Sequence, residues 1–297
     1  MKYSLSSGVW IALISACSHN QPDPRDSNYE LLNDRFAERQ VVASITDQRL
    51  NEASGLELSI ANPGYFWMHN DSGDTANLYL VARDGSIAMT VLLEGIYAND
   101  WEEMSLAVHD SIPYLYIGDT GDNPRKREQV TIHRIPEPVF DGATEDLLLP
   151  DSLIESLTFS YKEGPKDVEA FFYDPFAEKI TIVTKREESC LIYAFDFEPE
   201  KSPLVIESLG TIDLRNFTSA DINDKGEILL KNYPSIFYWS ADPSPAAERM
   251  LLIKPARIPY EPEPQGEALC WDEVGGFYSI SEFNEGFPQN LYYYPPR

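Results

Sequence analysis

Cysteine, histidine and long apolar segments are all scarce in this sequence. Only three cysteines and four histidines occur among 297 residues, and the histidines do not have the spacing of a zinc site. The N-terminal apolar stretch is too short to cross a bilayer as a helix. The chain has neither a Gly-x-Ser-x-Gly nucleophile elbow nor a glycine-rich phosphate loop. These absences argue against a zinc enzyme, a serine hydrolase of that kind and a nucleotide-phosphate site.

Basic residues are also few, with 23 Lys and Arg against 49 Asp and Glu and a net charge of −26. A phosphate backbone would be repelled by such a surface, so nucleic acid is excluded as a partner. The same charge argues against electrostatic docking on anionic lipid, so attachment to a membrane must come from acyl chains. Acidity of this degree indicates a solvated surface, with cation binding as the alternative.

The N-terminus has the pattern of an export signal. Lys2 supplies a positive charge, and an apolar core follows from Val9 to Ile14. The sequence Leu13-Ile-Ser-Ala-Cys17 resembles the lipobox of bacterial lipoproteins, in which the cysteine sulfur takes a diacylglycerol. We therefore predict a signal peptide over residues 1–16 and a mature chain of net charge −27 that starts at lipidated Cys17. The alternative is an ordinary cleaved secretory signal with a chance cysteine.

The residues after Cys17 predict a tether and a location. Residues 17–36 are polar, rich in Asn, Asp and Pro, and lack an apolar period, which is typical of a flexible segment. Ser18 after the cysteine resembles the pattern of lipoproteins sorted to the outer membrane, so we expect anchoring there, facing the periplasm. The folded domain is predicted over residues 37–297. Cys190 and Cys270 fall in different repeats of that domain, so a disulfide between them is not favoured.

Short runs of Val, Ile, Tyr, Phe and Trp, broken by Gly, Pro, Asn and Asp, predict an all-β protein. A unit consisting of a polar cluster, an apolar strand, a turn and a second strand with a polar end recurs about every fifty residues. Five copies are found, spanning residues 52–71, 100–119, 167–185, 218–232 and 265–282. Each is followed by a third strand with an aromatic residue. Fourth strands are expected at Ala88–Leu93, Ser156–Tyr161, Ile206–Ile212 and Met250–Ile253.

Such a repeat with about four strands is typical of a β-propeller. The last copy runs out of chain after Tyr294, and the segment Gln40–Ile45 can supply the missing strand and close the ring. We predict a single five-bladed propeller, with six blades if the stretch Pro136–Pro165 contains extra strands. A β-sandwich is the competing topology.

Several motifs resemble those of a family of largely uncharacterised secreted bacterial propeller proteins. The matching pieces, in the same order along the chain, are Asn70-Asp-Ser-Gly-Asp74, Asp100-Trp-Glu-Glu103, Tyr116-Ile-Gly-Asp-Thr-Gly-Asp-Asn123, Ile135-Pro-Glu-Pro138, Asp167-Val-Glu-Ala170, Ala220-Asp-Ile222 and Pro264-Gln-Gly-Glu-Ala268. The resemblance implies export and a propeller fold, and it implies no reaction. The chain is more distantly similar to phytase-like and lactonase-like propellers.

Equivalent repeat positions converge at one mouth of a propeller. One aligned position carries Ser54, Glu102, Glu169, Ala220 and Glu267, and the position two residues earlier includes Asp100 and Asp167. Among these residues the predicted metal ligands are Asp100, Glu102, Asp167, Glu169 and Glu267. The ends of the second strands supply the predicted ligand-binding residues Asp71, Asp119, Lys185 and Glu282.

A ring of carboxylates repels itself unless a cation compensates, and an oxygen-rich ring suits Ca²⁺. In the alternative, the acidic residues hydrogen-bond backbone amides between blades, and Lys185 neutralises part of the ring. Two functions follow from this pattern. The first is a non-catalytic propeller that binds a ligand or an envelope protein at an acidic mouth holding Ca²⁺. The second is a metal-dependent hydrolase of phosphoesters or lactones that uses the same ring.

Overall fold

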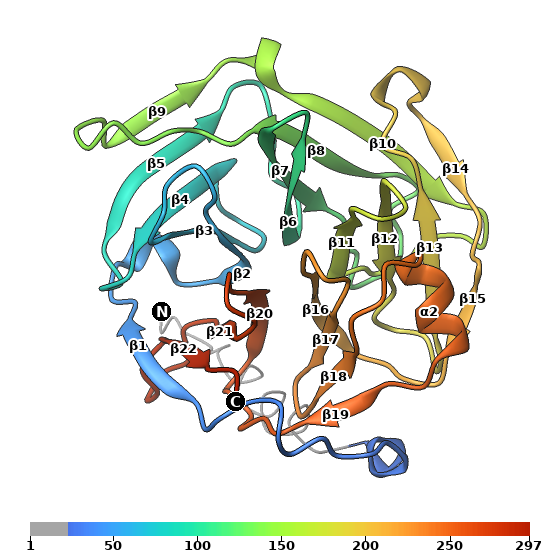
Figure 1. Cartoon of the computed structure of the whole chain (residues 1–297). Helices are drawn as coiled ribbons and strands as arrows, with labels where there is room; N and C mark the ends of the chain where they lie inside the picture. The colour runs from blue at the N-terminus through green and yellow to red at the C-terminus, as the bar shows by residue number, and fades with distance from the viewer. Residues whose placement is uncertain (1–22) are drawn as a thin grey trace, which may run out of the picture.

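A computed structural model describes residues 23–297, and it contains five antiparallel sheets arranged in a ring (Figure 1). We number the sheets as blades 1 to 5 along the chain, each with its first strand innermost. Blade 1 contains β2 (Ala53–Leu58), β3 (Tyr65–Asn70), β4 (Asn77–Ala82) and β5 (Ile87–Leu93). Blade 2 contains β6 (Trp101–His109), β7 (Ile112–Asp119), β8 (Val130–Pro136) and β10 (Glu155–Tyr161).

The other three blades follow the same order from the centre outward. Blade 3 contains β11 (Ala170–Asp174), β12 (Lys179–Val183), β13 (Cys190–Phe195) and β15 (Gly210–Ile212). Blade 4 contains β16 (Phe217–Ile222), β17 (Ile228–Asn232), β18 (Ile236–Trp239) and β19 (Ala256–Ile258). Blade 5 contains β20 (Gly266–Trp271), β21 (Phe277–Ser281), β22 (Asn290–Tyr294) and β1 (Gln40–Ser44). The predicted five-bladed propeller is confirmed.

The ring is closed by the N-terminal strand, as predicted. β1 pairs antiparallel with β22, with Gln40 opposite Tyr293 and Ser44 opposite Asn290. The innermost strands β2, β6, β11, β16 and β20 contact one another in ring order. Each blade therefore has its two faces covered by its two neighbours, which a single blade cannot achieve alone.

The stretch from Pro136 to Pro165 adds outer strands and no sixth blade. β9 (Asp146–Leu149) lies parallel to β5 at the edge of blade 1, and the chain then returns to blade 2 as β10. In the same way β14 (Leu204–Ile206) lies parallel to β10. The strand predicted over Ile206–Ile212 is therefore two strands, which belong to neighbouring blades and tie them together.

The strand predicted at Met250–Ile253 is wrong. These residues lie at the end of helix α2 (Ala246–Leu252), and the fourth strand of blade 4 is β19. The helix segment reads Ala-Ala-Glu-Arg-Met-Leu-Leu, which consists entirely of good helix formers, and it starts directly after Pro245.

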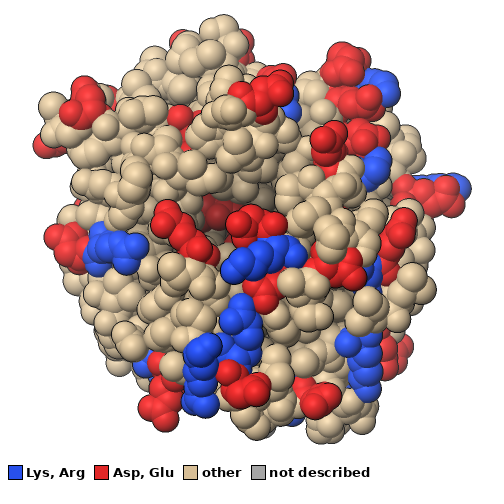
Figure 2. Space-filling model, in the orientation of Figure 1, with Lys and Arg blue, Asp and Glu red and all other residues tan. Residues whose placement is uncertain are grey.

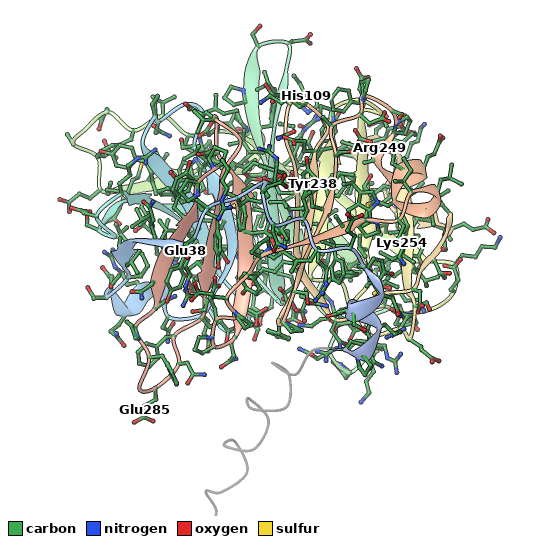
Figure 3. The ribbon with its side chains drawn as sticks, turned by 60° about the horizontal axis from the view of Figure 1, so that its bottom comes forward. Glu38, His109, Tyr238, Arg249, Lys254 and Glu285 are labelled. Carbon is green, nitrogen blue, oxygen red and sulfur yellow. The ribbon has the colours of Figure 1, made fainter. Side chains whose placement is uncertain are left out.

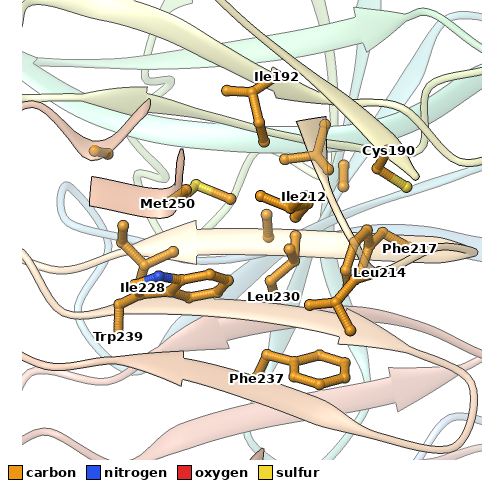
Figure 4. Packing of buried hydrophobic residues seen from close by; sticks show 14 of the residues in the cluster. Cys190, Ile192, Ile212, Leu214, Phe217, Ile228, Leu230, Phe237, Trp239 and Met250 are labelled. Atoms are coloured by element: carbon orange, nitrogen blue, oxygen red, sulfur yellow. The ribbon is translucent and has the colours of Figure 1, made fainter. Parts of the chain in front are cut away.

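The core consists of apolar clusters between adjacent blades. Figure 4 shows the cluster between blades 3 and 4, where Phe217, Phe237 and Trp239 pack with Ile192 and Met250. Burial of such a side chain contributes about 1.5–3 kcal/mol relative to leaving it exposed. Cys190 and Cys270 are both buried free thiols, as expected. No helix among the described residues is long and apolar enough to cross a membrane.

The described part of the expected tether is held against the propeller. Asp26, in the 3-10 helix η1 (Pro24–Asn28), is buried and accepts a 2.8 Å hydrogen bond from Ser235. Phe36 is buried against Trp271 and Phe277. Residues 23–36 are thus part of the folded unit, because the polar composition that suggested a tether supplies ion pairs and hydrogen bonds to the blades. The signal peptide and Cys17 lie outside the described residues.

Candidate functional site

The predicted site residues lie at one end of the central channel. In every blade the innermost strand begins, and the second strand ends, at this same end. Glu285, in the loop between β21 and β22, marks this end, and His109, at the turn between β6 and β7, lies at the other (Figure 3). We call the end marked by Glu285 the mouth.

Two groups of three carboxylates meet at the mouth, and they share Glu102. Single ligand oxygens of Asp71, Asp100 and Glu102 all lie within 4.8 Å of one another, and the same holds for Glu102, Asp167 and Glu169. We call these the first and second carboxylate groups. Asp71 comes from blade 1, Asp100 and Glu102 from blade 2, and Asp167 and Glu169 from blade 3. The two groups therefore bridge three blades.

The second carboxylate group is neutralised by basic side chains. The Lys185 ammonium forms an ion pair with Glu169, and both side chains are about 5% exposed. The Arg186 Nε donates to Asp167 Oδ2 at 2.5 Å, and its Nη2 lies 3.8 Å from Glu169. Asp167 also accepts the backbone amide of Asp122 at 2.9 Å. Two cations therefore already face the two carboxylates that are not shared.

The first carboxylate group has no such ion pair among the described residues. Burial, and then the nearby charge of Asp100, raise the pKa of Asp71 to about 7. Burial also raises the pKa of Asp100, although a hydrogen bond with Asp71 and the charge of Arg127 act against it. Asp71 and Asp100 lie close enough for the charge of Asp100 to raise the pKa of Asp71, as closely spaced carboxyl groups do.

Glu102 is the most deeply buried residue of this group. Its side chain is 3% exposed, and its Oε1 makes no hydrogen bond. Burial, followed by the charge of Asp71, raises the pKa of Glu102 well above its usual value. A buried carboxylate oxygen without a partner is costly, so this atom needs a proton, a water molecule or a cation.

Gly121 leaves open the space beside this oxygen. A Cβ at Gly121 would lie 2.2 Å from Glu102 Oε1 and 2.6 Å from Asp100 Oδ2, so no larger residue fits without displacing the carboxylates. The sequence Asp119-Thr-Gly-Asp-Asn123 resembles a Ca²⁺ loop in composition. Its glycine has a steric role at the first carboxylate group.

Hydrogen bonds connect Lys185 of blade 3 with side chains of blades 4 and 5 at the mouth. The Tyr233 hydroxyl lies 3.4 Å from Lys185 Nζ and donates to Glu267 at 2.9 Å. Glu282 accepts from Gln265 at 2.7 Å, and burial with the charge of Glu267 raises the pKa of Glu282 to about 8. Glu267 is thus held by Tyr233 and lies outside both carboxylate groups.

In two blades, the strand pairing differs from the alignment of the repeats expected from the sequence. In blade 4, Phe217 pairs with Asn232, so Thr218 and Tyr233 occupy the positions assigned to Ala220 and Asn232. In blade 2, Trp101 pairs with Asp119, which places Asp119 one residue before the mouth position. A β-bulge follows the corresponding pair in blades 1, 2, 4 and 5 alike, so the shifts lie in where the ends of the strands were assigned.

Asp119 is engaged in structural contacts. It forms a 2.7 Å ion pair with Arg127 and accepts the backbone amides of Asn99 and Asp100 at 3.2 Å each. The Arg127 Nη1 also donates to the carbonyl of Gly121 at 2.7 Å. Asp119 and Arg127 therefore fix the loops that carry Asp100 and Gly121.

A third set of buried carboxylates, missed in the sequence, lies deeper in the channel. Glu103 accepts the amides of Met104 and Ala220, Glu57 accepts that of Leu106, and Asp221 accepts those of Ile222 and Trp271. Burial is the main cause of the raised pKa of all three, which for Asp221 is about 7. Glu57 and Asp221 join adjacent inner strands and Glu103 joins β6 to β16 across the channel, which is the structural role that the sequence left open for the mouth.

The opposite face of the ring is acidic at its centre as well. Figure 2 presents the face that carries the turn between β6 and β7, and it shows Asp and Glu side chains gathered in and around the central recess. The channel is thus acidic at both ends.

No protein-family model matches the chain, and no curated protein is similar to it. Similar solved structures include a streptogramin B lyase, with 9% identity over 89% of this chain and 98% of that chain and a TM-score of 0.45. A protein described as a putative gluconolactonase has 11% identity over 89% and 94%, with a TM-score of 0.45. A glucose dehydrogenase has 7% identity over 86% and 99%, with a TM-score of 0.48. At these values the fold assignment depends on the strand pairing of the chain itself.

Proposed function

We propose that this protein is a lipid-anchored envelope propeller that binds Ca²⁺ at the mouth and uses it to hold an anionic ligand. The observation that carries the proposal is the unpartnered, buried Oε1 of Glu102 within a carboxylate group that has no ion pair among the described residues. Ca²⁺ prefers carboxylate oxygens, and it tolerates irregular geometry. Asp71, Asp100 and Glu102 would hold it.

The basic side chains that pair with the second carboxylate group support an anionic ligand. Arg186 and Lys185 lie beside the first group, and the Arg186 side chain is 32% exposed. A carboxylate or phosphate bound to the cation would find this guanidinium next to it. Asp71, Lys185 and Glu282 would then border the ligand, as the sequence predicted, while Asp119 acts through Arg127.

A metal-dependent hydrolase of lactones or phosphoesters is the second candidate. The observation in its favour is the presence of two mouth carboxyls with a pKa near neutrality, Asp71 at about 7 and Glu282 at about 8. Such groups suit general acid–base catalysis, and a bound Ca²⁺ would polarise the scissile group. Calcium-dependent turnover of generic lactone, ester and phosphoester substrates would favour this candidate over binding alone.

The cation is tested by thermal melting with Ca²⁺ and with chelator. A cation that binds only the folded state raises stability, by about 2.7 kcal/mol at a concentration of 100 times Kd. Glu102→Gln should abolish this difference while leaving the calcium-free protein equally stable or more stable. Glu285→Gln, in an exposed loop at the same end, is the matched control. Equal melting of the wild type with Ca²⁺ and with chelator would refute the cation site.

The anchor is tested separately. Cys17→Ser should prevent incorporation of labelled fatty acid and leave the precursor uncleaved, because the acyl chain is carried by that sulfur. Incorporation of label into the variant would contradict the lipid anchor, and it would leave the cation site unaffected.

A further inference from the structure

The folded chain begins at a point that is fixed by ion pairs. Asp23 accepts hydrogen bonds from Arg25 and, at 2.8 Å, from Arg215 Nε. Arg25 also donates to Asp213 Oδ1 at 2.8 Å and to the carbonyl of Glu188 at 2.7 Å. These contacts tie residue 23 to the rim between blades 3 and 4.

A short covalent path separates this point from the predicted lipid. Cys17 precedes Asp23 by six residues, which can span at most about 21 Å when fully extended. A folded chain of this size has a radius of gyration of about 19 Å, so its far side lies more than about 40 Å away. With Cys17 lipidated, the flank of the ring around Asp23 would lie nearest the bilayer.

That flank carries a groove of mixed polar and apolar lining, with two exposed apolar side chains beside it. The groove has a volume of about 240 Å³ and is lined by Tyr29, residues 211–214, Trp239 and residues 250–255. Leu252 is 83% exposed and Ile253 is 50% exposed, although both are large and apolar. Lys254, labelled in Figure 3, donates to the carbonyl of Asn28 at 2.6 Å and lies over the Tyr29 ring. The groove and the start of the folded chain are thus held together.

We propose that this flank, at Leu252, Ile253 and Lys254, rests on the lipid bilayer to which Cys17 is anchored. The two apolar side chains enter the headgroup region, and the ammonium lies at the level of the lipid phosphates, as amphipathic side chains do at an interface. The inference depends on the anchor in the proposed function and goes beyond it.

Other occupants of the groove fit these observations less well. The net charge of −26 opposes a purely electrostatic contact with anionic lipid, so the lipid contact has to be apolar and held by the anchor. A second copy of the chain would bring the same net charge and is not directed to this flank by a tether. The short path from Cys17 therefore favours the bilayer.

The test uses the full, natively acylated protein in vesicles of phosphatidylethanolamine and phosphatidylglycerol. An environment-sensitive fluorophore is attached at Leu252→Cys or, as a matched control, at Ala143→Cys, an exposed position before β9 on the other side of the ring from η1 (Figure 1). The native Cys190 and Cys270 are buried and do not compete for the label. Nitroxide-bearing lipids should quench the label at 252 several-fold more than the label at 143.

The possible results distinguish the docking of the flank from the lipid anchor. Equal quenching at the two positions, or none at 252, with the acyl chain found by mass spectrometry, overturns the docking and leaves the anchor standing. Absence of the acyl chain overturns both. Burial of the label at 252 in the Cys17→Ser protein without vesicles identifies a second copy as the occupant and overturns the docking. In the acylated protein, Ile253→Ser should reduce quenching at 252, because it removes apolar contact with the lipid.

Discussion

The first carboxylate group and the deep carboxylates of the channel differ in their hydrogen bonding, although the pKa is raised in both. Asp71, Asp100 and Glu102 at the mouth, like Glu57, Glu103 and Asp221 inside, have a pKa raised mainly by burial. Hydrogen bonds from backbone amides hold each deep residue, whereas one oxygen of Glu102 has no partner. A raised pKa therefore does not by itself identify a site.

This difference in hydrogen bonding indicates two roles for buried carboxylates in this propeller. The deep residues accept amides of other inner strands: Glu57 from β6, Asp221 from β20, and Glu103 from β16 across the channel. At the mouth, Asp71 accepts the amide of Ser72, whereas Glu102 Oε1 has no backbone donor. A carboxylate at the mouth is thus left for a basic side chain or for a cation.

The largest effect is expected deep in the channel. Glu103→Ala leaves the amides of Met104 and Ala220 without their acceptor in a buried place. We expect a loss of about 2–6 kcal/mol in the free energy of unfolding, since each of the two unsatisfied buried donors costs about 1–3 kcal/mol. Urea denaturation should give the same loss with Ca²⁺ and with chelator. A loss that calcium reverses would place Glu103 in the cation site and break the comparison.

Removal of the Lys185 charge from the second carboxylate group should create a second cation site. Lys185→Met leaves Glu169 buried without its partner, and breaking a buried ion pair costs about 3–5 kcal/mol. In chelator the variant should therefore be strongly destabilised. Calcium should restore more stability in the variant than it adds to the wild type, because Glu102, Asp167 and Glu169 then form a second group able to bind a cation. Equal calcium shifts in the two proteins would show that Lys185 does not exclude a cation.

The fold was more predictable than the site, for physical reasons. Alternating apolar strands and the missing last strand predicted the blades and the closing β1. The helix α2 was missed because Met250–Ile253 is apolar enough for either element, and its helix-forming neighbours were given too little weight. The pairing of Lys185 and Arg186 with the second carboxylate group joins side chains across loops, and nothing in the local sequence reports it. Tyr233 was missed because the second strand of blade 4 was expected to reach the mouth at Asn232, one residue earlier.

Gly121 gives a steric test of the same group. Gly121→Ala places a methyl group against Glu102 Oε1 and Asp100, so the carboxylates must turn away from one another. We expect calcium affinity, measured by isothermal titration, to fall about tenfold or more, which corresponds to about 1.4 kcal/mol or more. The protein in chelator should lose less, because the protonated carboxyls can move. Unchanged affinity would place the cation elsewhere in the mouth.

The smallest effect is the pH dependence of calcium binding. The pKa of Asp71 is raised from 3.8 to about 7, so in chelator the folded state holds a proton that the unfolded state has lost between these values. Stability in chelator should therefore fall as pH rises from about 4 to 7. Calcium must displace this proton, so the effect of Asp71 alone should lower the calcium affinity about tenfold for each pH unit below 7.

Asp71→Asn should flatten this dependence, whereas Asp221→Asn, which changes a deep carboxylate with the same pKa of about 7, should leave it unchanged. If Asp221→Asn flattened it instead, the deep channel would be the cation site, and the distinction between the two sets of carboxylates would fail.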